Sequence, residues 1–276
     1  HPDVLSRVAD WRMREDADRE TFEAITRCIR LGADEELIQL PPNVRGDGRG
    51  GTDETAASES PAEASYVAFA RSVWRRLIER LEASPSFERY APLFVFDVRQ
   101  IVTAIEYSTL AIDRPDLATP TDLRRYETHN MGMYSYLDID LMFTQDDHRD
   151  DLDTVRRVID PAQRMARIGN WLSTWERELR EGDVSSGVVI AADDRGIVTR
   201  EKLRETGAAE RDDAAVENAI VRIRESDVEA ELLEEWNEQY HRLVTLSDEI
   251  DAFDLDPFVE GTKDVLRYHL ASRGYK

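Results

Sequence analysis

The sequence predicts an all-α protein that folds as one domain over residues 1–276. Apolar residues recur every three or four positions along nearly the whole chain, which is the period of an amphipathic helix. The periodic segments are bounded by proline, threonine, glycine and aspartate, the residues that commonly open or end helices. Only Val188–Ile190 fits a short strand as well as it fits a helix, so both assignments stay open there.

The first two helices are predicted over residues 64–82 and 85–113, each from an apolar stripe. The stripe runs from Tyr66 to Leu81 in the first segment and from Phe87 to Leu110 in the second. Residues 44–64 are rich in Gly, Ser, Thr and Glu and hold almost no apolar residue. We expect a flexible surface loop there, within the domain rather than between domains.

The later helices are predicted from capping residues as well as from periodicity. A Pro-Thr-Asp sequence at Pro120 opens a helix that we expect to run to about Phe143. Pro161 is expected in the first turn of the next helix, which ends at Glu181 before a Gly-Asp pair. Periodicity alone predicts further helical segments at residues 211–247 and 257–272.

The charge balance restricts the partners of this chain. Asp and Glu number 58 against 36 Lys and Arg, which gives a formal net charge of −22. Such a surface repels phosphate backbones and anionic membranes, which argues against nucleic-acid binding. The only lysines are Lys202, Lys263 and Lys276. Excess carboxylate with few lysines is typical of proteins from a high-salt cytoplasm, where counter-ions screen the repulsion.

Cysteine content and apolar run lengths exclude further classes. The single cysteine, Cys28, cannot form an internal disulfide framework or a thiolate zinc site. The longest apolar runs, such as residues 92–96 and 188–192, are far too short to span a bilayer. No charged-then-apolar leader opens the sequence as given, so we expect a reducing, cytoplasmic location.

Residues 163–183 carry a pattern of hard oxygen ligands. Asn170, Thr174 and Glu178 are four residues apart, so their side chains project from one side of a helix. Amide, hydroxyl and carboxylate oxygens in this arrangement suit Mg²⁺. Arg177 stands where it could hydrogen-bond a diphosphate oxygen beside the ion. A solvated helix face shows the same spacing, so the pattern alone leaves both interpretations open.

This segment resembles the second metal motif of class I terpene synthases, in which Asn, Ser or Thr, and Glu are four positions apart and a basic residue precedes the Glu. The Gly-Asp-Val-Ser-Ser sequence from Gly182 resembles the stretch that follows the motif in bacterial members. The upstream order of a Trp- and Arg-containing helix, a long helix, a Pro-Thr-opened helix and a Gly-Met break at Gly132 resembles the middle of that family.

The resemblance covers about residues 8–275 and implies an isoprenoid-synthase helical bundle around a deep apolar cavity. It implies Mg²⁺ as cofactor, several ions being held together with the diphosphate, and a prenyl diphosphate as substrate. A homodimer is compatible with it. The N-terminal helices that precede the first metal motif in the family have no counterpart in this sequence.

The resemblance also implies catalytic arginines. Arg124 stands 46 positions before Asn170 (170 − 124 = 46), the separation of the diphosphate-sensing Arg of the family, with Arg125 as the second candidate. If the sequence is instead aligned to the family at the Gly-Met break, His129 or Asn130 stands at the position of the sensor arginine.

Near the chain end, the family has an Arg-Tyr pair that folds over the diphosphate. Arg267-Tyr268 matches this pair literally, whereas Arg273 and Tyr275 match its distance from the end. The resemblance further implies that aromatic side chains line the cavity, where they would stabilise a carbocation. The candidates are Phe94, Phe96, Tyr107 and Trp171.

The first aspartate motif of the family has only a partial counterpart. Asp10 is the expected metal ligand there, assisted by Glu15 or Asp16. Its interval to Asn170 is long, and the loop at residues 44–64 accounts for the excess. Residues 146–150 match the Asp-Asp-x-x-Asp pattern literally, but we interpret them as an acidic loop between helices.

Two other functions stay open. A prenyl transferase of the squalene and phytoene type has the same fold but needs two aspartate motifs. A non-catalytic helical protein with a degraded first motif would instead bind an isoprenoid or a protein partner.

We predict that stability rises with salt. The net charge of −22 repels itself most strongly in dilute buffer, where the Debye length is about 30 Å at 0.01 M salt. The Tm should therefore increase from dilute buffer to molar KCl in thermal melts. A Tm independent of salt would exclude the high-salt interpretation.

Overall fold

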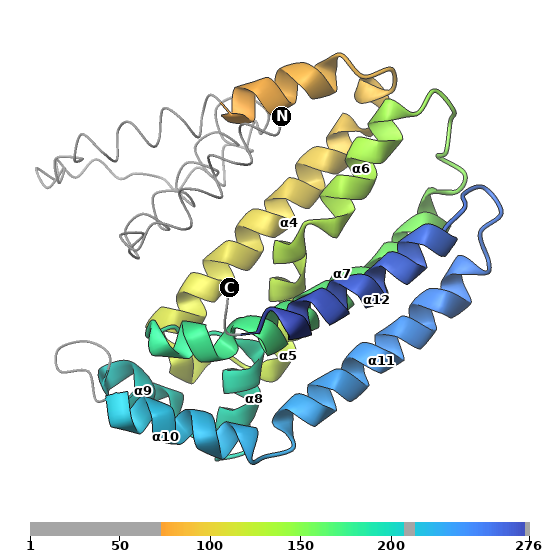
Figure 1. Ribbon diagram of the computed structural model, residues 1–276. Helices are drawn as coiled ribbons and strands as arrows, with labels where there is room; N and C mark the ends of the chain where they lie inside the picture. The colour runs from red at the N-terminus through yellow and green to blue at the C-terminus, as the bar shows by residue number, and fades with distance from the viewer. Residues whose placement is uncertain (1–72, 207–212, 274–276) are drawn as a thin grey trace, which may run out of the picture. The chain divides into compact units, whose positions relative to one another are not determined.

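The structure is a computed structural model, and it describes residues 73–206 and 213–273 (Figure 1). Every regular element in these ranges is a helix and none is a strand, which confirms the all-α prediction for the described part of the chain. Residue contacts divide the chain into two compact units, residues 1–95 and 96–276. The expected loop at residues 44–64 lies outside the described residues, and the single domain stays a prediction.

The described part of the first unit is helical, as predicted. Residues 73–82 form one helix, and α4 (Phe87–Asp113) then begins and continues into the second unit. In the described ranges, no helix combines the length and apolarity needed to cross a membrane.

The second unit is organised around α7 (Leu152–Arg180). This helix contacts α6, α8, α10, α11, α12 and η2, and Figure 1 shows α12 and α11 running alongside it. The other elements are η1 (Pro115–Leu117), α5 (Pro120–Tyr126), η2 (Glu127–Met131), α6 (Met133–Phe143), α8 (Gly187–Asp194), α9 (Arg200–Thr206), α10 (Asp213–Arg224), α11 (Val228–Ser247) and α12 (Asp256–Ala271).

The predicted continuous helix over residues 120–143 is wrong, because the chain turns in the middle. Thr119 caps α5, its hydroxyl accepting a hydrogen bond from the amide of Asp122 at 3.1 Å. Gly132 has φ +68°, a left-handed conformation that ends η2 and lets α6 begin in a new direction.

The predicted start of the next helix is also wrong. Pro161 lies inside α7, which begins nine residues earlier, at Leu152 (161 − 152 = 9). Proline lacks the amide that an interior helical position normally uses, and so removes one backbone hydrogen bond. The preceding turns are held by buried Val155, Val158 and Ile159, so packing outweighs this local loss.

The remaining segments are helical, with one interruption. Val188–Ile190 belongs to α8, which decides between the strand and helix assignments. The predicted segment at residues 211–247 is divided into α10 and α11 by a turn at Ser226. The Ser226 hydroxyl donates to the carbonyl of Ile223 and accepts from the amide of Val228, which ends one helix and starts the next.

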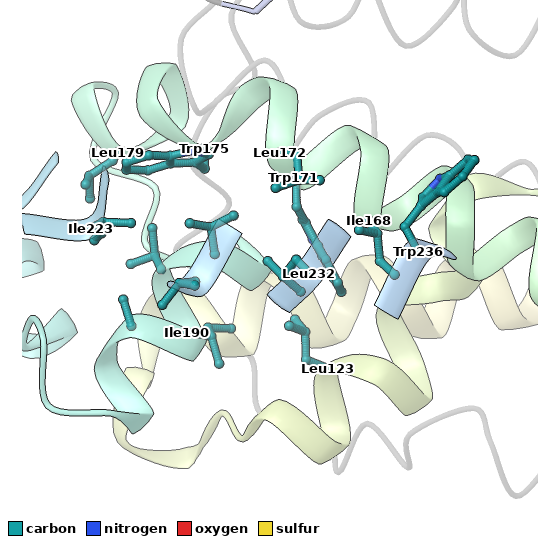
Figure 2. Close-up of a cluster of buried hydrophobic side chains, with 14 of the residues drawn as sticks. Leu123, Ile168, Trp171, Leu172, Trp175, Leu179, Ile190, Ile223, Leu232 and Trp236 are labelled. Atoms are coloured by element: carbon teal, nitrogen blue, oxygen red, sulfur yellow. The ribbon is translucent and has the colours of Figure 1, made fainter. Parts of the chain in front are cut away.

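The core of the second unit is built on the apolar stripe of α7, as predicted. Figure 2 shows the stripe facing side chains from α5, α8, α10 and α11. Its members are Met165, Ile168, Leu172, Trp175 and Leu179, together with Trp171. Gly187 of α8 packs directly on the Trp171 ring, where an added Cβ would lie 2.5 Å from ring carbons. This close contact joins α8 to α7 and requires glycine at that position.

A buried charge cluster joins α4, α6 and α7. The Arg156 guanidinium donates to both carboxylate oxygens of Asp97, at 2.7 and 3.0 Å, and lies 3.5 Å from Asp138. The Asp138 side chain is 0% exposed. Burial, followed by the charge of Asp97 and a hydrogen bond with it, raises the pKa of Asp138 to about 8. One guanidinium thus neutralises Asp97, and Asp138 keeps its proton at neutral pH.

Replacing Asp138 by Asn is expected to remove a pH dependence of stability. The pKa of Asp138 in the folded state lies above the unfolded value of 3.8. Its contribution to the free energy of unfolding is therefore complete below pH 3.8 and is lost as the pH rises through about 8. The Tm of Asp138→Asn relative to the wild type should therefore increase across this pH window in thermal melts. The exposed Asp248→Asn is the control, and a Tm difference for Asp138→Asn that does not change with pH would contradict the assignment.

Candidate functional site

The polar face of α7 is enclosed rather than solvated. Thr174 is 4% exposed, the Glu178 side chain is 22% exposed, and Asn170 is half-buried. On this face, Arg167 donates a hydrogen bond to Glu127 of η2. The negative charge of Asp183, which precedes α8, acts on Glu178. The face is therefore not a fully solvated one, and its assignment as a metal site stays a prediction.

A line of hydrogen bonds connects this face to two other elements. The Thr174 hydroxyl donates to the carbonyl of Asn170 at 2.8 Å, and Arg167 Nη1 donates to Asn170 Oδ1 at 2.9 Å. Arg167 Nη2 also donates to Glu127 Oε2 at 2.5 Å. The Ser108 hydroxyl of α4 donates to the other oxygen of Glu127 at 2.7 Å. The polar face is therefore part of one continuous network.

The electrostatics at Glu178 favour a cation. Burial, and then the neighbouring carboxylate of Asp183, raise the pKa of Glu178 to about 7. A hydrogen bond from Thr174 and the charges of Arg167 and Arg177 only partly offset this, and Arg177 Nη2 lies 3.8 Å from Glu178. The two arginines thus do not offset the burial of Glu178, and a divalent cation at this carboxylate would favour its ionised form.

The residues present fit Mg²⁺ through a mixed set of oxygen donors. Within the described ranges, no group of three or more His, Cys, Asp or Glu side chains is arranged to hold a metal ion. The amide of Asn170, the hydroxyl of Thr174 and the carboxylate of Glu178 lie on one enclosed helix face, which suits a hard cation that keeps further positions for substrate oxygens. Asp10, Glu15 and Asp16, the predicted ligands of the first motif, lie outside the described residues.

The predicted sensor arginine is already paired. Arg124 donates to both oxygens of Glu235 on α11, with Nε–Oε1 at 2.9 Å and Nη2–Oε2 at 2.8 Å. Arg125 is exposed, with its guanidinium 5.4 Å from the centroid of the Tyr126 ring. His129, the alternative in the other register, is half-buried and hydrogen-bonds Gln163 at 3.3 Å. For Arg124 to bind a diphosphate, it would have to exchange Glu235 for the anion.

The predicted C-terminal arginines lie away from the polar face. Arg273 Nη2 donates to Glu176 at 2.9 Å and to Glu229 at 2.5 Å. Glu176 and Glu178 are roughly 200° apart around the helix axis, so Arg273 binds a different side of α7. Arg267 and Tyr268 are exposed, and Arg267 pairs with Asp264. Tyr275 lies outside the described residues.

The predicted cavity aromatics have different environments. Tyr107 and Trp171 are buried members of the core, and the Tyr107 hydroxyl donates to the carbonyl of Thr119. Phe94, in the first unit, is buried, whereas Phe96 is exposed. Tyr107 and Trp171 belong to one core cluster, and the apolar cavity stays a prediction.

The acidic segment at residues 146–150 is part of the connection between α6 and α7, as predicted. Arg149 donates to the carboxylate of Asp147, and His148 lies within 3.5 Å of Asp151. A surface depression of about 430 Å³ lies nearby, and half of its lining residues are acidic. It is formed by Asp151, Thr154, Glu249, Ile250, Asp251 and Ala252, at the opposite end of α7 from Glu178.

Three charged residues of this region were not predicted as functional. Arg167 lies one helical turn before Asn170, so its spacing could have indicated the contact. Glu127 is 40 positions from Arg167, and only the fold brings the two together. Glu176 binds Arg224 and Arg273, partners 48 and 97 positions away that no local pattern indicates.

Comparison of the chain with models of known protein families finds no match, and neither does comparison with curated proteins. The function must therefore be argued from the residues and geometry described above.

We expect Glu176→Gln to destabilise the fold. Burial raises the pKa of Glu176, but the hydrogen bonds and charges of Arg224 and Arg273 outweigh this and hold the pKa below its ordinary value. Losing the carboxylate weakens the junction of α7 with α10 and with the segment that follows α12, at a cost of about 1–2 kcal/mol in the free energy of unfolding. Denaturant titration measures this, with the exposed Glu217→Gln as control.

A stability of Glu176→Gln equal to that of Glu217→Gln would contradict the proposed junction. The comparison is matched because both substitutions remove one carboxylate that pairs with arginine, and only the burial and the number of partners differ.

Proposed function

We propose that this chain is a Mg²⁺-dependent enzyme of the class I terpene synthase type, with an isoprenoid-synthase fold, that ionises a prenyl diphosphate in a high-salt cytoplasm. One observation carries the proposal. The Asn170, Thr174 and Glu178 oxygens share a largely enclosed face of α7, next to Arg177, where burial raises the pKa of Glu178. On a solvated helix face, these side chains would be exposed and the pKa of Glu178 would be undisturbed.

The chemistry expected at this face is the heterolytic cleavage of a carbon–oxygen bond. The electron pair of the bond goes to the departing diphosphate, and an allylic carbocation stays behind. Bound Mg²⁺ would neutralise the diphosphate as it leaves. Asn170, Thr174 and Glu178 would hold the ion, with Glu178 ionised once the cation is present.

The arginines of this chain would complete the binding of the diphosphate. Arg177 is half-exposed, beside Glu178, and pairs with Glu181 at 3.0 Å, a contact that an incoming anion can replace at little cost. Arg124 would have to leave Glu235. Such preorganised positive groups stabilise charge that develops on the leaving group.

The pairing of the arginines favours a second candidate, a non-catalytic binding protein of the same fold. Arg124 is fully engaged by Glu235, and Arg273 by Glu176 and Glu229. If these pairs are permanent, only Arg177 near the motif is available to an anion. The protein would then bind an isoprenoid or a partner without ionising a diphosphate.

The substitution Glu178→Gln tests the proposed enzyme. Because the pKa of Glu178 is about 7, the side chain is already close to half-protonated at neutral pH, so Gln should change the free energy of unfolding by less than about 1 kcal/mol. Loss of the carboxylate should lower Mg²⁺-dependent turnover about 100-fold or more, because a neutral amide cannot hold the ion beside the diphosphate.

The measurements are calorimetric binding of Mg²⁺ with inorganic pyrophosphate, and turnover of geranyl, farnesyl and geranylgeranyl diphosphates in molar KCl. The control is Glu217→Gln, which removes an exposed carboxylate on α10. Binding that is equal in the wild type and both variants would exclude the metal assignment. Pyrophosphate binding without turnover of any of the three substrates would favour the non-catalytic candidate.

A further inference from the structure

Arg167 occupies the position next to the proposed metal site on α7. Its guanidinium donates to Asn170 Oδ1 at 2.9 Å and to Glu127 Oε2 at 2.5 Å, and its central carbon lies 5.2 Å from the centroid of the Trp171 ring. The Arg167 side chain is only 12% exposed, and that of Glu127 is 0% exposed. The two residues therefore form a buried ion pair, and Arg167 also hydrogen-bonds Asn170 of the proposed metal motif.

Asn170 Oδ1 is the oxygen that a hard cation would use, because the nitrogen of a neutral amide does not bind Mg²⁺. In this structure, that oxygen accepts a hydrogen bond from Arg167, so the guanidinium and a metal ion compete for it. The competition is electrostatic as well, because the positive charge of Arg167 opposes the approach of a divalent cation to its neighbour.

Glu127 determines how strongly Arg167 opposes the cation. Its carboxylate neutralises the guanidinium, and Ser108 fixes the carboxylate from α4. Arg167 Nε has no hydrogen-bond partner among the described residues, and the two hydrogen bonds that Arg167 donates there go to Asn170 and Glu127. If Arg167 gives up Asn170, Glu127 is the contact that retains it in the buried site.

We infer that Arg167 and Glu127 are a positioning pair that sets the metal affinity of the Asn170–Thr174–Glu178 site, an inference that rests on the proposed function. Arg167 holds the amide oxygen of Asn170 while no metal is bound, and releases it to Mg²⁺. Glu127 retains the guanidinium after this exchange. No covalent bond changes in this step, since one hydrogen bond is replaced by one metal–oxygen contact.

The inference makes two predictions of opposite sign. Arg167→Gln removes the competing charge and frees Asn170, so the Kd for the metal ion should fall roughly threefold to tenfold. Glu127→Gln leaves the charge of Arg167 uncompensated beside the site, so the Kd should rise by about the same factor. A pair with a purely structural role would weaken metal binding in both variants, in proportion to the lost stability.

The experiment uses the full chain, with Mn²⁺ as the probe and inorganic pyrophosphate present. Free Mn²⁺ is measured by electron paramagnetic resonance, in molar KCl, for the wild type and each variant, with thermal melts in parallel. Arg180→Gln is the matched control, because it removes one positive charge from the same helix at a half-exposed position that pairs with Glu217. Its Kd should equal that of the wild type within about twofold.

Should Arg167→Gln fail to fold because Glu127 is left buried and unpaired, the double variant Glu127→Gln/Arg167→Gln removes both charges. It should bind Mn²⁺ more tightly than Glu127→Gln alone. Opposite shifts in the single variants, or this order in the double variant, support the inference. If the variants bind Mn²⁺ with the same Kd as the wild type, or if both single variants bind it more weakly, the inference is overturned. The proposed metal site itself is unaffected by that result, because the wild type still binds the ion. Absence of Mn²⁺ binding by the wild type overturns the proposed function itself, and the inference with it.

Discussion

The burial of most of α7 among neighbouring helices is the constraint on which the rest of the second unit depends. Six other elements contact this helix, and its apolar stripe forms the centre of the core. Where a charged side chain of this helix is buried, as at Arg167 and Glu176, it needs a partner from a neighbouring element. The ion pairs of α7 therefore determine where α4, η2, α10, α11 and α12 can pack against it.

These pairs join arginines to carboxylates in a chain that has few lysines. Arginines number 33 (36 − 3), and the guanidinium fork can bind a carboxylate through two hydrogen bonds while partly buried. Arg156 with Asp97 and Arg224 with Glu176 both show this geometry between helices. Some of the carboxylates therefore have a structural use inside the protein, as partners of arginines between helices.

The sequence predicted what local patterns determine and missed what only the fold determines. The stripe of α7 and the helices α4 and α12 follow from periodicity, because each depends on residues within a few turns. The resemblance included a break at Gly132, but periodicity did not separate α5 from α6 there, and the extension of α7 through Pro161 depends on packing that periodicity does not show. At the site, the common face of Asn170 and Glu178 was predictable, whereas its enclosure and the partners of Arg124 and Arg273 were not.

The partners of the arginines also define what a ligand must do. Arg124, Arg167 and Arg273 all bind carboxylates of this chain, so an anion that recruits any of them must replace a bond already made. Replacement is most costly where the abandoned carboxylate is buried, as at Glu127, and least costly where it is exposed, as at Glu181 beside Arg177. A diphosphate would therefore engage Arg177 first, and a buried arginine only when metal ions bring enough positive charge to release its partner.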